Sequence, residues 1–102
     1  MLLAMDVGNT NIVMGVYQGE ALLASWRLST RVEMSADEIG MFLCQLLEHD
    51  RIDRSGIEAV IISSVVPPIM FSLEKAIKRY IGQTPIIVGA GLKTGINIKY
   101  RR

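Results

Sequence analysis

The chain has 102 residues, the length of one domain, and a net charge of +1 from 11 basic and 10 acidic residues, which gives no electrostatic case for nucleic-acid binding. Half of the residues are hydrophobic, but no apolar run reaches the ~18 residues that span a bilayer, and no basic segment precedes Leu2 as in a signal peptide. The single cysteine, Cys44, cannot form an internal disulfide, so we expect a cytoplasmic protein. From the net charge and the short apolar runs we expect no nucleic-acid and no membrane partner.

The most informative segment lies near the N-terminus. An apolar run at residues 2–5 leads into Asp6, Val7, Gly8, Asn9, Thr10 and Asn11, and a second apolar run follows from Ile12. This pattern predicts a strand, a tight turn and a second strand. Such a turn can bind phosphate, because Gly8 lets the backbone come close, Asn and Thr side chains donate hydrogen bonds, and Asp6 can hold Mg²⁺ or its water. The alternative is a β-hairpin whose turn merely favours Gly and Asn.

A third strand is predicted over residues 21–28, after a two-residue turn at Gln18-Gly19. The N-terminal third of the chain is therefore expected to form an antiparallel three-stranded meander with a polar first turn. In this respect it resembles the start of the nucleotide-binding domains of the actin, hexokinase and acetate-kinase group.

A helix is predicted over about residues 35–49. Ser35 and Glu38 form a capping-box pattern, and an apolar face follows at Ile39, Phe42, Leu43, Leu46 and Leu47. Cys44 is interpreted as core packing in this helix. A polar connection is expected over residues 48–56.

The second half of the chain alternates strands with a helix. Residues 57–64 predict a strand buried on both faces, and Ser63 and Ser64 at its end are interpreted either as loop-structuring residues or as ligand contacts. A helix is predicted from Pro67-Pro68 to Gly82, with Tyr80 on its apolar face. A short strand over residues 85–88, a loop at 89–91 and an extended or irregular tail over 92–100 complete the pattern.

The element order is therefore β-β-β-α-β-α-β, which predicts an α/β fold, a ribonuclease-H-like half-domain with a mixed central sheet. We expect the first strand in the middle, the hairpin strands on one side, and the later strands parallel to it on the other side. Phosphates would then approach at the carboxyl end of the first strand, beside Asp6.

Four segments in this order resemble the N-terminal part of type III pantothenate kinases: residues 6–11, 35–38, 62–68 and 94–100. The resemblance implies ATP-dependent phosphorylation of pantothenate, the first step of coenzyme A biosynthesis. It also implies Mg²⁺ with ATP, a monovalent cation (K⁺ or NH4⁺), and a homodimer in the complete protein.

Carried over to this chain, the resemblance assigns ATP-phosphate binding to Asp6, Val7, Gly8, Asn9, Thr10, Asn11, Ile12 and Val13. It makes Asp6 the metal residue and Tyr100 a contact to pantothenate. Residues 1–90 would form the nucleotide- and phosphate-binding domain, and residues 91–102 would begin the connection to a substrate-binding segment and a second domain. The general base, in a Gly-x-Asp-Arg motif, is expected beyond Arg102, so the chain alone is expected to be inactive.

Two other functions are compatible with this sequence. The chain could be a non-catalytic actin-like module that binds nucleotide or a partner protein in a regulatory role, or the fold could serve a kinase with a different acceptor. An Asp6→Asn substitution separates the enzyme from the regulatory module, because only the enzyme should lose turnover.

Overall fold

The computed structural model describes residues 1–64 and 66–89. Their strands and helices follow the expected order, with a short 3₁₀ helix and a final π-helical turn added. The elements are β1 (Leu2–Val7), β2 (Asn11–Gln18), β3 (Ala21–Ser29), α1 (Ala36–His49), η1 (Arg54–Gly56), β4 (Ala59–Ser64), α2 (Pro67–Ala76), η2 (Ile77–Ile81) and β5 (Ile86–Val88).

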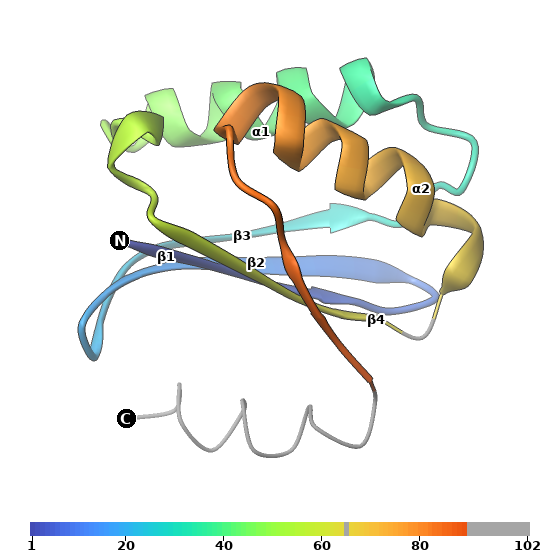
Figure 1. The fold of residues 1–102 in the computed structure, drawn as a ribbon, viewed down its shortest axis with the longest axis horizontal. Coiled ribbons are helices and arrows are strands. Elements are labelled where there is room, and N and C mark those ends of the chain that lie inside the picture. The colour runs from blue at the N-terminus through green and yellow to red at the C-terminus, as the bar shows by residue number, and fades with distance from the viewer. Residues whose placement is uncertain (65, 90–102) are drawn as a thin grey trace.

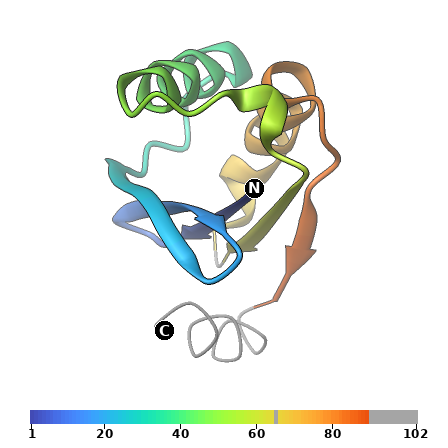
Figure 2. The same ribbon diagram turned by 90° about the vertical axis from the view of Figure 1, so that its left-hand side faces the viewer.

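The strands form one five-stranded mixed sheet in the order β3-β2-β1-β4-β5. The central strand β1 is antiparallel to β2 and parallel to β4, and β5 extends the sheet parallel to β4. The expected α/β class, the mixed sheet and the central position of the first strand are thereby confirmed. Both helices lie on the same face of the sheet (Figures 1 and 2).

The core lies between that face and the two helices. Alternate residues of the strands point toward the helices, and residues at spacings of three and four on the helices point back. The largest fully buried side chains come from both layers: Leu3, Val7, Ile12, Met14, Val16, Leu43, Leu47, Ile57, Ile62, Ile69, Leu73 and Ile77. The periodicity that predicted strands and helices is thus the periodicity that builds the core.

The helix boundaries follow the expected signals. Ser35 caps α1 with a complete capping box, and Gly82 ends the second helical segment in the left-handed conformation, with φ of 80°. Within α1, however, Phe42 is 41% exposed and Cys44 is only half-buried. The prediction that both residues pack in the core is therefore wrong. Both lie at the margins of the apolar stripe, beside rather than on the line of fully buried residues.

Two strand boundaries differ from the prediction. The β2–β3 turn is formed by Gly19 and Glu20 rather than by Gln18-Gly19, because Gln18 still pairs with Ala21 and the positive φ of 61° falls on Gly19. A register shift between Val16 and Tyr17 accompanies this turn. The predicted strand over 57–64 begins instead at Ala59, because Ile57 caps the 3₁₀ helix η1.

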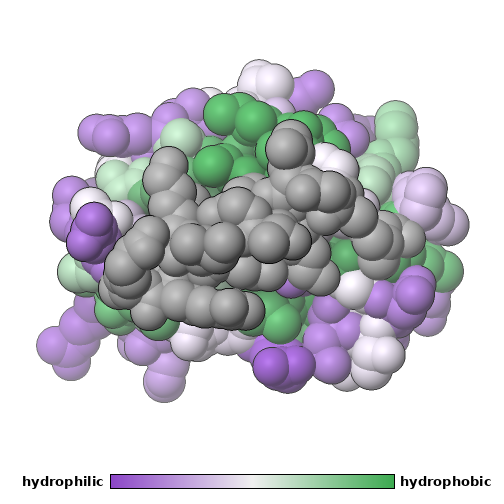
Figure 3. Space-filling view, turned by 90° about the horizontal axis from the view of Figure 1, so that it is seen from below, coloured by the Kyte–Doolittle hydropathy of each residue, from purple (hydrophilic) through white to green (hydrophobic). Residues whose placement is uncertain are grey.

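The second face of the sheet is less covered than the apolar pattern predicted. Val13, Leu22 and Ile86 are 38%, 52% and 55% exposed, and Ile61 of β4 is half-buried rather than buried. Hydrophobic side chains are visible on this side of the molecule in Figure 3. The continuous apolar run in β4 therefore reflects two apolar faces, of which the helices cover one.

The predicted strand over 85–88 is present as β5, whereas Tyr100, the tail over 92–100 and most of the loop at 89–91 lie outside the described residues. None of the helices in the described ranges has both the length and the apolar character needed to cross a membrane.

Candidate phosphate-binding site

The candidate site lies where several strands end and both helices begin, at what we call the carboxyl edge of the sheet because the carboxyl ends of these strands lie there. Strand β3 is antiparallel to β2, which is antiparallel to β1, so β1, β3 and β4 all run in one direction and their carboxyl ends share this edge. The turn over residues 8–10 connects β1 to β2 there (Figure 1). Helices α1 and α2 follow β3 and β4 and therefore start near the same edge. The carboxyl edge of a sheet with parallel strands is where α/β proteins commonly bind ligands.

The turn itself is tight. The backbone N–H of Gly8 donates to the carbonyl oxygen of Asn11 at 2.8 Å. A β-carbon at Gly8 would lie 3.3 Å from that same oxygen, which is closer than ordinary van der Waals contact. Asn9 and Thr10 at the tip are exposed. Glycine therefore favours the close approach of the two strands, and the polar tip is exposed.

The flanking residues of the predicted phosphate segment divide by burial. The side chains of Val7 and Ile12 are 1% and 2% exposed in the core, so only their backbone could contact a ligand. Val13 points to the opposite face of the sheet, and Asn11 is half-buried. The exposed polar side chains of this segment are therefore those of Asn9 and Thr10.

Asp6 is the penultimate residue of β1 and is half-buried. It lies beside Val13 of β2 and Ser63 of β4 in the sheet register. Its neighbours in β1, Met5 and Val7, point toward the helices, so its carboxylate lies on the opposite face of the sheet. Ser63 is 4% exposed, a buried hydroxyl one strand away from Asp6.

Asp6 fits the role of a single carboxylate beside a phosphate-bound Mg²⁺. Magnesium in phosphoryl-transfer sites is usually held by one or two carboxylates, with phosphate oxygens and water completing its coordination. Within the described part of the chain no group of three or more His, Cys, Asp or Glu residues is arranged to hold a metal ion. A single carboxylate such as Asp6 could contribute one ligand to a metal whose other ligands come from phosphate and water.

Thr30 was not among the sequence-predicted site residues, yet it contacts the turn twice. Its hydroxyl donates to the carbonyl oxygen of Gly8 at 2.7 Å, and its backbone N–H donates to the carbonyl oxygen of Thr10 at 2.9 Å. Thr30 follows β3 directly, so the common edge of β1 and β3 brings these residues together. The only signal in the sequence was a hydroxyl residue at the end of the third strand.

Ser64, at the end of β4, has a structural role in the described contacts. Its hydroxyl oxygen accepts a hydrogen bond from the backbone N–H of Val66 at 3.0 Å, just before α2 begins at Pro67. This contact supports the loop-structuring interpretation for Ser64.

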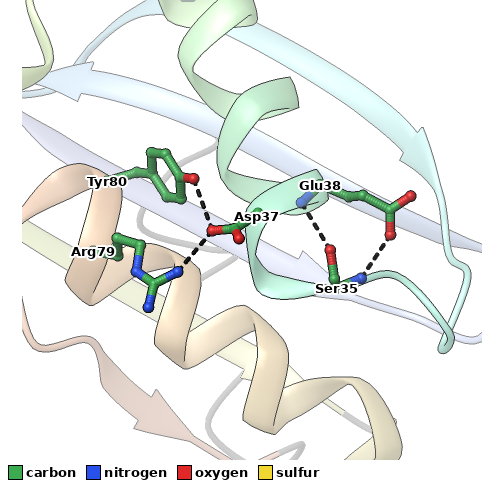
Figure 4. A network of polar contacts seen from close by, with 5 residues as sticks. All are labelled: Ser35, Asp37, Glu38, Arg79 and Tyr80. Carbon is green, nitrogen blue, oxygen red and sulfur yellow. Dashed lines mark hydrogen bonds and ion pairs between the residues drawn. The ribbon is translucent and has the colours of Figure 1, made fainter.

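A polar network surrounds the start of α1 (Figure 4). The backbone N–H of Glu38 donates to the hydroxyl of Ser35, and the Glu38 carboxylate accepts from the N–H of Ser35 in return. One carboxylate oxygen of Asp37 accepts from both Tyr80 and Arg79 at 2.8 Å. The hydrogen bonds from Tyr80 and then Arg79 lower the pKa of Asp37, and the hydrogen bond to Asp37 raises the pKa of Tyr80. These residues join α1 to η2 rather than forming part of the phosphate-binding edge.

A groove of about 800 Å³ opens elsewhere, between the second half of α1, the η1 segment and η2. Arg51, Arg54 and Arg79 line it, and an Arg54 Nη1 donates to the Sγ of Cys44 at 2.8 Å. None of the sequence-predicted phosphate-binding residues lines this groove. The candidate site is therefore the polar turn and not this groove.

Comparison with solved structures supports the fold. A ROK hexokinase from Thermus thermophilus superposes with a TM-score of 0.65 at 16% identity, covering 86% of this chain and 34% of the hexokinase. A protein from Bacteroides thetaiotaomicron with an actin-like ATPase fold and unknown function gives a TM-score of 0.57 at 13% identity, covering 85% of this chain and 32% of that protein. At such identities the likeness concerns the fold alone, which is actin-like and ribonuclease-H-like.

Sequence comparison is more specific. The chain is 51% identical over 100 residues to the type III pantothenate kinase of Halalkalibacterium halodurans, which covers 98% of this chain and 39% of that relative. The chain therefore spans about two fifths of the length of this relative. The family model for type III pantothenate kinase matches residues 2–102. The chain belongs to the type III pantothenate kinase family.

Proposed function

We propose that this chain supplies the ATP-phosphate-binding half of an enzyme that phosphorylates pantothenate, the first step of coenzyme A biosynthesis. The observation that carries the proposal is the tight polar turn at residues 8–10, two residues after Asp6, at the edge where the carboxyl ends of β1, β3, β4 and β5 lie. Family membership supports this reaction class and this acceptor.

The arrangement suits the demands of phosphoryl transfer, which depends mainly on positioning and on neutralising charge at the phosphates. Backbone N–H groups of the turn, with the Asn9 and Thr10 side chains, would hold phosphate oxygens. Asp6 would orient Mg²⁺ or its bound water, and the metal when bound neutralises phosphate charge. The close approach at Gly8 fixes the distance between the two arms of the turn.

Other parts of the site would come from elsewhere. We propose that the general base and the second-domain contacts come from a part of the full-length enzyme outside these 102 residues. We assign the pantothenate contact to Tyr100. A general base must reach the acceptor hydroxyl within hydrogen-bond distance. We therefore expect the 102-residue chain by itself not to phosphorylate pantothenate. We further propose a cytoplasmic homodimer that uses ATP with Mg²⁺ and a monovalent cation, K⁺ or NH4⁺.

The proposal is tested by Asp6→Asn in a full-length protein that contains this segment. The amide keeps the shape of the carboxyl group but removes its charge, so kcat for pantothenate phosphorylation should fall about a hundredfold or more. Glu20→Gln is the matched control, because Glu20 is exposed in the β2–β3 turn at the opposite edge of the sheet. A folded Asp6→Asn variant with unchanged turnover would favour a non-catalytic nucleotide- or partner-binding role.

A further inference from the structure

Thr30 makes two hydrogen bonds to the candidate phosphate-binding turn from outside it. The hydroxyl reaches the Gly8 carbonyl oxygen at 2.7 Å and the backbone N–H reaches the Thr10 carbonyl oxygen at 2.9 Å. Both distances are typical of well-formed hydrogen bonds. A single residue at the end of β3 therefore holds the turn at its first and last residues.

These contacts orient the peptide groups of the turn. The described peptide bonds are all trans, so each carbonyl and the following N–H point in opposite directions. Holding the Gly8 oxygen toward Thr30 therefore directs the N–H of Asn9 away from Thr30. The two carbonyl oxygens that Thr30 engages are also kept from turning toward an incoming anion, which their partial negative charge would repel.

We propose that Thr30 is a positioning residue that presets the turn over residues 8–10 to receive the nucleotide phosphates. This inference rests on the proposed function, since it needs the turn to bind phosphate. Thr30 itself acts through Gly8 and Thr10 and need not contact the nucleotide. A turn held in one arrangement before binding loses less conformational freedom when the ligand arrives. Removing the Thr30 hydroxyl should therefore weaken nucleotide binding more than pantothenate binding.

The backbone contact survives any substitution at residue 30 other than proline, so a side-chain change isolates the hydroxyl. Thr30→Val keeps the branched shape of threonine and replaces its hydroxyl by a methyl group, leaving the half-buried Gly8 carbonyl without that donor. Thr30→Ser keeps the donor and removes a methyl group. Thr84→Val is the matched control, because Thr84 is an exposed threonine outside the turn.

The experiment uses full-length protein and two measurements: equilibrium titration with Mg-ATP, and kcat and KM for ATP and for pantothenate. For Thr30→Val we expect ATP affinity and kcat/KM for ATP to fall about fivefold to tenfold, the size of one lost hydrogen bond. The KM for pantothenate should change less than twofold. Thr30→Ser and Thr84→Val should stay close to the wild type.

Three outcomes would overturn the inference. The first is a folded Thr30→Val variant with wild-type affinity for ATP, and the second is a Thr30→Ser variant as weak as Thr30→Val. The third is a loss for both substrates in proportion to the folded fraction, because that would make Thr30 a purely structural residue. Failure of the proposed function is distinct from these, since the wild type itself would then transfer no phosphoryl group to pantothenate.

Discussion

The ring of Tyr80 occupies the space where a β-carbon on Gly40 would stand. Gly40 is a buried residue of α1, and Tyr80 belongs to the π-helical turn η2 that follows α2. The tyrosine hydroxyl continues past Gly40 to the carboxylate of Asp37, one turn earlier in α1. The absence of a side chain at Gly40 thus lets the end of the second helical segment pack closely on the first.

The first prediction follows from this packing. Alanine is favoured over glycine in a helix interior by about 1 kcal/mol, so propensity alone predicts that Gly40→Ala stabilises the protein. The added methyl group would displace the Tyr80 ring and break its hydrogen bond to Asp37, and overpacking of this kind costs about 1–3 kcal/mol. We therefore expect a net loss of up to about 2 kcal/mol in the free energy of unfolding, measured by urea denaturation. Gly89→Ala is the control, because the added carbon would meet no other described residue within 4 Å apart from its chain neighbours.

The second prediction concerns the dependence of stability on pH. Hydrogen bonds from Tyr80 and Arg79 lower the pKa of Asp37 in the folded protein. A carboxyl whose folded pKa is lowered contributes stability above its unfolded pKa, and that contribution is lost as the pH falls through the folded pKa. Asp37→Asn should therefore lower Tm at neutral pH, and the difference from the wild type should shrink below about pH 4. A Tm difference that stays constant between about pH 7 and pH 3 would contradict this interpretation.

The third prediction concerns Arg51, which has a positive φ of 60° just after α1. Its N–H donates to the carbonyl of Glu48, and the N–H of Ile52 donates to that of Leu47, the Schellman pattern in which glycine usually occupies this position. A side chain in this conformation costs about 1–2 kcal/mol, which the greater freedom of glycine in the unfolded chain partly offsets. We expect Arg51→Gly to raise the free energy of unfolding by about 0.5–1 kcal/mol. Arg51→Ala should give no such gain, and an equal gain from both would assign the effect to the arginine side chain.

The fourth prediction tests the tightness of the phosphate turn. A methyl group at Gly8 would lie 3.3 Å from the Asn11 carbonyl oxygen, a backbone atom that would have to shift by a few tenths of an ångström to make room. In full-length protein Gly8→Ala should lower kcat/KM for ATP about tenfold or more, because small displacements in such sites are costly. Stability should change little, since the turn is at the surface. Wild-type kinetics in a folded Gly8→Ala variant would show that the close approach is not required.

Much of the fold was predictable because its signals are local. The change from a two-residue to a 3.6-residue period marked the strands and helices, the Ser35–Glu38 capping box marked the start of α1, and Gly82 marked the end of the second helical segment. The β2–β3 turn was predicted one residue too early, because the sequence does not show which residue takes the positive φ. Phe42 and Cys44 were assigned to the core because a stripe read from the sequence does not define its own margins.

The sequence by itself determined the polar turn after Asp6, the order of the elements and the family to which they belong. Only the tertiary structure decided that Thr30, 22 residues after Gly8, reaches that turn, and that Tyr80 fills the space beside Gly40. The physical reason is that periodicity, caps and turns depend on neighbours within a few residues. Contacts between distant residues depend instead on strand order, register and helix packing, which the whole core fixes together.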